Sequence, residues 1–157
     1  MTVRPFATTD TRVLADLYRD SVRGLGAQRY TPTQVEAWAS SADDLEGFEA
    51  KLSYGFTLVS LEEDIIAAFG ALFGWDSVSL LYCAPRFARR GHATAIYAQL
   101  EAASREHRVA RLTSTASYLS RPFFEKHGFS LVEIERTRFG GADFERFKME
   151  KPLAVAR

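Results

Sequence analysis

The sequence predicts a mixed α/β fold, with a largely antiparallel central sheet of about seven strands flanked by about four helices, in the order β-αα-βββ-α-β-α-ββ. Segments of alternating apolar residues are interspersed with segments whose apolar residues recur at helical spacing. Three strand-like segments in the middle of the chain are separated only by short turns, which favours antiparallel pairing. No repeat, linker or low-complexity stretch divides the 157 residues, so residues 1–157 are expected to form one domain.

The first elements are a short strand and an amphipathic helix. The strand is Val3–Phe6, and Asp10 is suited to cap the helix that follows. The glycines of 24–26 are expected to end this helix. Its apolar residues follow the i, i+3, i+4 rule and are Val13, Leu14, Leu17 and Tyr18.

A second helix is predicted to open at Thr31-Pro32, because proline is favoured in the first turn of a helix. Thr33 and Glu36 have the spacing of a capping box. The residues expected to face inward are Val35, Trp38 and Ala39. A further helical stretch around Phe48 and Leu52 precedes the sheet.

Three consecutive strands are expected next. Phe56–Glu62 and Ile65–Trp75 are joined by an acidic turn, and Ser77–Cys83 follows. Alternation along the third strand would place Val78, Leu80 and Tyr82 on one face and Ser79, Leu81 and Cys83 on the other.

The residues after this strand predict an anion site. Gly91-His92-Ala93 opens an amphipathic helix, and the first turn of a helix carries unpaired N–H groups and the positive end of the helix dipole. A glycine at the turn lets a phosphate approach those donors. Arg86, Arg89 and Arg90 add charges suited to phosphate. We therefore expect a phosphate-bearing cofactor here, with its other end along the preceding strand.

The last third of the chain completes the sheet. Arg111–Ser117 is a predicted strand, and Ser120 can cap a short helix that ends at Gly128. Leu131–Phe139 and Phe144–Glu150 are expected to pair as a hairpin around Gly140-Gly141.

Composition excludes several classes of protein. Twenty basic and twenty acidic side chains cancel, so no global field favours nucleic acid or an anionic membrane. The longest apolar run, residues 65–75, is too short to span a bilayer. The single cysteine and the absence of a signal-like start fit a cytoplasmic protein. The three histidines lack metal-like spacing, so no metal site is expected.

Two blocks of sequence resemble the GNAT superfamily of N-acetyltransferases. LLYCAPRFARRGHATAIYAQLE is similar to the acetyl-CoA motif of the family, a strand and a proline followed by Q/R-x-x-G-x-G/A into a helix. SRPFFEKHGF is similar to a later block, a short helix that closes on Gly-Phe. The resemblance extends over nearly the full chain.

The resemblance implies acetyl-CoA as the cofactor and predicts which residues contact it. The pyrophosphate would be wrapped mainly by backbone N–H groups of Arg89, Arg90, Gly91, His92, Ala93 and Thr94, with Arg86 nearby. The pantetheine arm would bond to the main chain of Leu81, Tyr82 and Cys83 at a splayed or bulged strand. Ser117 stands where the family often has a CoA-contacting Asn.

Two positions depart from the family pattern. Ala88 replaces the usual Gln or Arg of the motif, a role that Arg89 or Arg86 could take over. Phe124 stands at a CoA-contacting position where many members have a Tyr that protonates the departing thiolate. Tyr118 is the candidate replacement acid.

The chemistry also requires a base, because a free alkyl amine has a pKa of about 10.4 and is mostly protonated at neutral pH. The strand Ser77–Cys83 contains no acidic residue, which leaves Asp76 and Glu36 as the candidate carboxylates. Asp76 alternatively serves only as a turn residue, and Glu36 only as the capping-box partner of Thr33.

The leading hypothesis is an N-acetyltransferase that moves the acetyl group directly to a small-molecule or peptide amine within a ternary complex. Tyr30 and Trp38 are candidate acceptor contacts, since this helical region flanks the acceptor site in the family. The alternative is a catalytically weak acyl-CoA-binding or regulatory module, suggested by Ala88, Phe124 and the missing strand glutamate. Open sheet edges leave a homodimer as a further expectation.

Overall fold

The computed structural model describes residues 1–154, and its seven-stranded sheet has the order β1-β2-β3-β4-β5-β7-β6. All neighbouring strands are antiparallel except β4 and β5, which are parallel. The predicted fold class is confirmed. The strands are β1 (Thr2–Pro5), β2 (Phe56–Glu62), β3 (Ile65–Phe73), β4 (Ser77–Cys83), β5 (Arg111–Ala116), β6 (Ser130–Phe139) and β7 (Ala142–Pro152).

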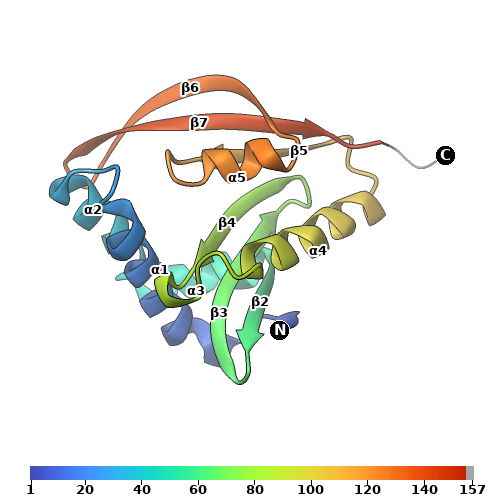
Figure 1. Cartoon of the computed structure of the whole chain (residues 1–157), viewed down its shortest axis with the longest axis horizontal. Coiled ribbons are helices and arrows are strands. Elements are labelled where there is room, and N and C mark those ends of the chain that lie inside the picture. Colours follow the sequence, from blue (N-terminus) through green and yellow to red (C-terminus); the bar gives the residue numbers. More distant parts are fainter. Residues whose placement is uncertain (155–157) are drawn as a thin grey trace.

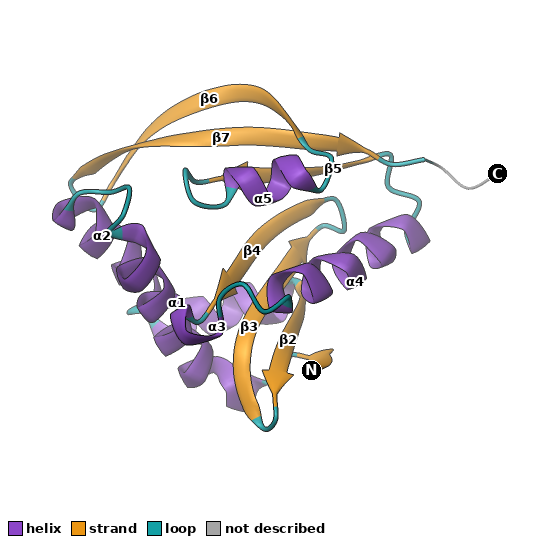
Figure 2. Ribbon diagram, in the orientation of Figure 1, coloured by secondary structure: helices purple, strands orange, loops and turns teal. Residues whose placement is uncertain are grey.

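Residues 1–154 contain five α-helices where about four were expected, because the stretch before β2 forms a full helix. They are α1 (Thr11–Gly26), α2 (Pro32–Ala39), α3 (Leu45–Tyr54), α4 (His92–Glu106) and α5 (Arg121–Lys126). Figures 1 and 2 show α4 in front of β2 and β3, with α3 behind them. None of the helices within residues 1–154 combines the length and apolar character needed to cross a membrane.

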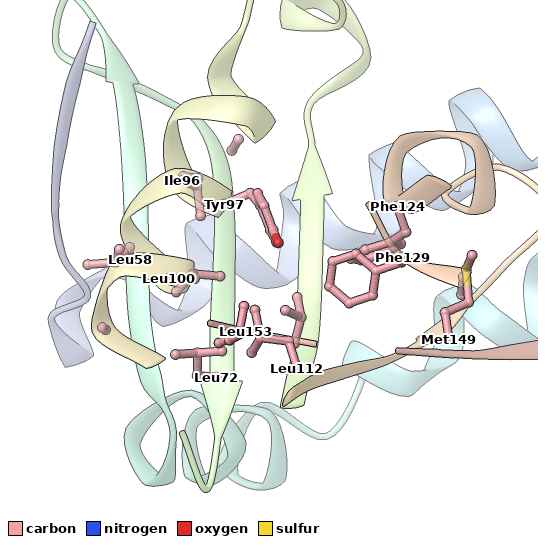
Figure 3. Packing of buried hydrophobic residues seen from close by; sticks show 14 of the residues in the cluster. Leu58, Leu72, Ile96, Tyr97, Leu100, Leu112, Phe124, Phe129, Met149 and Leu153 are labelled. Carbon is pink, nitrogen blue, oxygen red and sulfur yellow. The ribbon is translucent and has the colours of Figure 1, made fainter. Parts of the chain in front are cut away.

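Two apolar clusters cover opposite faces of the sheet. One joins α4 and α5 to the strands and includes Ile96, Leu100 and Phe124. Figure 3 shows Ile96, Tyr97 and Leu100 on α4 near Leu58 and Leu72, with Phe124 and Phe129 close to Met149. The other cluster joins α1, α2 and α3 to the opposite face. The sheet is therefore sandwiched between two helical layers, so a ligand that reaches both must pass through the sheet.

The start of α1 differs from the sequence prediction. Asp10 makes no side-chain cap; its carboxylate accepts hydrogen bonds from the Arg4 guanidinium (2.8 and 3.0 Å) and from the Ala7 N–H. The hydrogen bond from Arg4 is the main reason that the pKa of Asp10 lies below its usual value. Val13, expected inside, is 50% exposed, because the stripe that packs on the sheet runs through Leu14, Leu17 and Tyr18.

The capping box of α2 lies two residues earlier than predicted. Thr31 accepts from the Gln34 N–H, and the Gln34 side chain accepts in return from the Thr31 N–H. Glu36 is therefore free of any capping role. It pairs instead with Arg23 on α1, at 3.0 and 3.1 Å.

Strand β4 contains a bulge that breaks the predicted alternation. Ala71 of β3 pairs with Leu80 and Leu72 with Val78, so Ser79 is an extra residue in the ladder. Val78 consequently belongs to the α4 side, whereas Leu80 and Tyr82 pack on the α1 side. The prediction that Val78 shares a face with Leu80 and Tyr82 was wrong for this reason.

The parallel pairing between β4 and β5 is short. It consists of Ser77 with Thr113 and Val78 with Ser114, after which the two strands separate. Beyond Val78, β4 keeps its partner β3 on one side and leaves its other edge without a strand. The sheet is therefore open at its centre, and this opening positions the site.

Candidate active site

A cavity of about 600 Å³ occupies the opening between β4 and β5. Its walls include α1 and α2 residues from one face of the sheet and α4 and α5 residues from the other. The hairpin β6–β7 contributes Thr137–Phe139 and Phe144–Arg146. A single cavity thus extends from Ala93, at the start of α4, to the helical region that was expected to hold the acceptor.

The N-terminus of α4 has the backbone geometry of an anion site. Gly91 is the N-cap with φ of +90°, and Arg89 has φ of +62°, so the chain turns sharply twice before the helix. Within residues 1–154, the first α4 amide with a backbone acceptor is that of Ala95, which donates to the Gly91 carbonyl at 3.0 Å. The earlier amides, including those of Ala93 and Thr94, are available to a ligand, and Ala93 lines the cavity.

Space and conformation at Gly91 both fit a phosphate. A Cβ added there would meet only the Met1 Cε atom at 3.8 Å, so the approach to the helix is open. The positive φ is one that L side chains rarely adopt. The predicted cradle for the pyrophosphate of CoA is therefore compatible with this chain.

The three arginines of the loop lie in different environments. Arg86 and Arg90 lie over the ring of buried Phe87, at 4.7 and 5.5 Å from its centroid. Arg90 also pairs with Glu62 on β2 at 2.8 Å. Arg89 is exposed. The loop is thus anchored by Phe87 and Glu62, while positive charge remains at the surface.

The side chain of His92 points into the protein, unlike the backbone N–H that was predicted to bind phosphate. It is 1% exposed, and its Nδ1 atom lies 2.7 Å from the Ser60 hydroxyl on β2. Its Nε2 atom has no hydrogen-bond partner within residues 1–154 and lies 4.0 Å from a Glu62 oxygen. Burial lowers the pKa of His92. His92 therefore fastens the start of α4 to β2.

The free edge of β4 lies along the cavity. Leu81, Tyr82 and Cys83 all line it, and each pairs with β3 on the other side. An extended ligand can take the place of the missing strand here, as the predicted pantetheine contacts require. Burial raises the pKa of the Cys83 thiol, which does not favour a thiolate nucleophile.

Ser117 and Phe124 line the same cavity on the α5 side. The Ser117 hydroxyl oxygen accepts from the N–H groups of Leu119 and Ser120, so it also organises the turn before α5. Phe124 is buried, with its ring edge-on to Phe129 at 5.0 Å. Because the phenyl ring of Phe124 has no ionisable proton, Phe124 cannot protonate a thiolate.

Aromatic rings dominate the opposite end of the cavity. Tyr30 and Trp38, the predicted acceptor contacts, pack edge to face at 5.3 Å. The Trp38 indole N–H donates to the Tyr82 hydroxyl at 3.4 Å, and the Tyr82 ring lies 4.5 Å from that of Tyr18. Burial raises the pKa of Tyr18, Tyr30 and Tyr82, so each of these hydroxyls remains protonated at neutral pH.

Tyr118, the predicted acid, lies beside the cavity without being one of its lining residues. Its hydroxyl donates to the carboxylate of Glu145 on β7, and this bond raises the pKa of Tyr118. Its N–H donates to the Tyr30 hydroxyl at 2.9 Å. The phenolic proton is thus directed at a carboxylate.

The two predicted carboxylates are outside the cavity. Asp76 is exposed in the β3–β4 turn, where its carbonyl accepts from the Thr113 N–H at 2.8 Å. Glu36 is exposed on α2, and its hydrogen bonds from Arg23 lower its pKa. Neither residue is brought together with Tyr118 at a common point, so neither is placed to take a proton in the cavity.

Four further side chains at the aromatic end of the cavity, three aromatic rings and one carboxylate, were not predicted from the sequence. These are Tyr18 on α1, the ring of Tyr82, and Phe144 and Glu145 on β7. Tyr18 and Phe144 read as ordinary core residues in isolation. Glu145 lies in a run of alternating charges that is typical of an exposed strand, and only the sheet order places it next to the end of β5.

No group of His, Cys, Asp or Glu able to hold a metal ion occurs in the part of the chain that the structure describes. The cavity instead supplies backbone amides, an open strand edge, aromatic rings and one carboxylate. This chemistry suits one ligand with an anionic end and an extended polar arm, bound together with a second ligand that is apolar.

Comparison with known proteins identifies the family. Residues 26–151 match the model of the acetyltransferase (GNAT) domain. The chain is 29% identical over 147 residues to the uncharacterized N-acetyltransferase YafP of Escherichia coli (strain K12), covering 94% of this chain and 93% of that protein.

Solved structures agree. A GCN5-related N-acetyltransferase from Rhodopseudomonas palustris superposes with a TM-score of 0.94 at 31% identity, covering 97% of this chain and 95% of that one. The fold is also that of the PaiA N-acetyltransferase from Thermoplasma acidophilum, solved with coenzyme A (TM-score 0.75, 17% identity, 98% and 100% covered). The chain belongs to the GNAT family of acetyltransferases, enzymes that take an acetyl group from acetyl-CoA.

Proposed function

We propose that this protein transfers the acetyl group of acetyl-CoA directly to an amine held in the same cavity. The observation that carries the proposal is the cavity itself, which runs through the opening between β4 and β5 and reaches both helical layers. Donor and acceptor can therefore meet inside the sheet without a covalent enzyme intermediate. The raised pKa of Cys83 is consistent with direct transfer.

On the donor side, backbone groups do the binding. The first-turn amides of α4, with Arg86, Arg89 and Arg90 around them, would hold the pyrophosphate. The main chain of Leu81, Tyr82 and Cys83 would hold the pantetheine arm, and Ser117 and Phe124 would close the α5 side. When bound, acetyl-CoA supplies an activated thioester. An N–H on the free edge of β4 is suited to polarise its carbonyl.

On the acceptor side, the aromatic end selects the partner. Tyr30 and Trp38, together with Tyr18, Tyr82 and Phe144, form an apolar wall that packs best against a flat or apolar body. The hydroxyls of Tyr30 and Tyr82 are protonated, so they can hydrogen-bond to the amine substrate but do not act as bases. We expect amines carried on an apolar body to be better acceptors than small polar amines.

Calorimetric titration with acetyl-CoA, followed by a thiol-release assay across a panel of amines, tests the proposal. Saturable binding with thiol release well above solvent background supports it. Binding without release from any amine favours the alternative of an acyl-CoA-binding module. A chain that does not bind acetyl-CoA contradicts the assignment of the cavity.

A further inference from the structure

The cavity contains a single acidic side chain among the described residues, that of Glu145. The side chain of Glu145 is 36% exposed, which places its carboxylate at the boundary between cavity and solvent. The other ionisable groups on the walls are poorly suited to accept a proton: the tyrosines and Cys83 have pKa values raised by burial. Lys51, Arg138 and Arg146 carry positive charge and repel a protonated amine.

Two side-chain contacts orient the carboxylate of Glu145. Tyr118, which follows β5, donates its hydroxyl to one carboxylate oxygen. The Nε atom of Arg136 on β6 lies 3.6 Å from the other oxygen, but Arg136 is 85% exposed and this pair is weak. The oxygen facing Arg136 is therefore only weakly paired and retains the capacity to accept a hydrogen bond from a ligand.

Tyr118 is itself fixed from several sides. Its ring packs against Phe147 at 5.0 Å and Tyr30 at 5.6 Å, and its N–H donates to the Tyr30 hydroxyl. The Arg29 guanidinium lies 5.2 Å from the ring centroid. A side chain held this firmly gives Glu145 a defined orientation, and Tyr30 connects it to the aromatic wall.

We propose, on the basis of the proposed function, that Glu145 accepts the proton of the acceptor amine and that Tyr118 is its positioning residue. This assignment reverses the role expected for Tyr118, because a hydroxyl that donates to a carboxylate is not directed at the thiolate. It also explains why no carboxylate is needed within β4, since β7 reaches the cavity from the other side of the opening.

The proton and electron balance is simple. The acceptor enters as an ammonium ion and gives one proton through Glu145 to solvent, which frees the nitrogen lone pair. That lone pair forms the C–N bond to the acetyl carbon while the C–S bond breaks and its electrons stay on sulfur. The second N–H proton passes to Glu145, which returns it to solvent, and the thiolate takes a proton from water. Overall the nitrogen loses two protons, of which one ends on sulfur and one in solvent.

Glu145→Gln is the decisive variant, measured by thiol release with 2-phenylethylamine and with the best amine of the panel. We expect kcat to fall about 100-fold or more, a typical loss for a general base, while the Kd for acetyl-CoA by calorimetry changes less than twofold. Raising the pH should recover part of the rate, because it supplies the neutral amine directly. Glu145→Asp should retain more activity than Glu145→Gln.

Glu150→Gln is the matched control. Glu150 lies on the same strand, its side chain is 32% exposed, and it pairs with Arg111 at 3.0 Å, but it lies outside the cavity. Its kcat should stay within twofold of wild type. A similar melting temperature for both glutamine variants separates chemistry from folding.

Tyr118→Phe tests the positioning role. Loss of the hydrogen bond that orients the carboxylate should reduce kcat about threefold to tenfold in the wild-type background and should have no further effect in the Glu145→Gln background, while the Kd for acetyl-CoA changes less than twofold. A purely structural role would lower kcat by a similar factor in both backgrounds.

The outcomes separate the two proposals. Wild-type kcat and an unchanged pH profile in Glu145→Gln would overturn the role of Glu145 while leaving the acetyltransferase intact. A wild-type chain that binds acetyl-CoA but acetylates no amine would remove the transferase activity itself, and the role of Glu145 with it.

Discussion

The two halves of the cavity that we propose for the acetyl donor and the amine acceptor, called the donor half and the acceptor half, are built in different ways. The donor half, from β4 through α4, offers mainly backbone groups: a strand edge without a partner and helix amides preceded by Gly91. The acceptor half offers side chains from α1, α2 and the β6–β7 hairpin. A site made of backbone tolerates side-chain change and is fixed by local sequence. A site made of side chains depends on distant segments, and this is where acceptor preference can change.

Gly91→Glu should give the largest effect, because it places charge and bulk where phosphate approaches the helix. We expect the Kd for acetyl-CoA to rise at least tenfold, measured by calorimetry. Gly141→Glu is the control, since Gly141 has φ of +80° and open space around it in the β6–β7 turn. Equal affinity in the two variants would show that phosphate binds elsewhere.

Trp38→Ala addresses the acceptor half. It removes the ring that packs on Tyr30 and the donor to the Tyr82 hydroxyl. The KM of an apolar amine should rise about tenfold with little change in the Kd for acetyl-CoA. Trp75→Ala, which removes an aromatic ring stacked on His107 away from the cavity, should leave both values unchanged. If acetyl-CoA affinity fell instead, the two halves would not be separable.

His92, at the start of α4, should make the free energy of unfolding depend on pH. Burial lowers its pKa in the folded state, so the unfolded chain binds more protons as the pH falls below about 6.5. The free energy of unfolding should decline between pH 7 and pH 5, with a slope from this group of at most about 1.4 kcal/mol per pH unit. Urea unfolding of wild type and His92→Gln across this range measures the difference. Parallel curves would mean that His92 does not contribute.

Arg90→Gln should have the smallest effect. Arg90 is exposed and already paired with Glu62, so its charge is partly screened from a bound phosphate. The Kd for acetyl-CoA should rise about twofold to fivefold at low salt, and less at 0.5 M salt. A larger loss that salt does not reduce would indicate direct, buried contact with the ligand.

Local signals made most of the fold predictable. The bounds of β2 and β4 agree with the prediction, and Gly91 is the N-cap of α4. The errors arise where tertiary contacts override local pattern. Asp10 binds Arg4 instead of capping α1. Ser79 forms a bulge that the alternation of residues along β4 does not predict.

The candidate site shows the same difference between features set by local sequence and features set by tertiary contacts. The loop and strand of the donor half were predictable because their geometry depends on adjacent residues. Glu145 was not, since it reaches the cavity only through the order β5-β7-β6, which sets the end of β5 beside the middle of the hairpin. The sequence indicates Tyr118 as a candidate site residue, but its donation to Glu145 depends on a residue 27 positions away.

The opening between β4 and β5 also makes substrate binding a contribution to stability. Strands β1–β4 and strands β5–β7 form two parts of the sheet, and these parts are joined by the two paired positions between β4 and β5. A pantetheine arm bonded along β4 would connect the two parts in the place of a further strand. By mass action, acetyl-CoA at 100 times its Kd would add about 2.7 kcal/mol to the free energy of unfolding. The fraction of the protein that is folded would then rise and fall with the supply of acetyl-CoA.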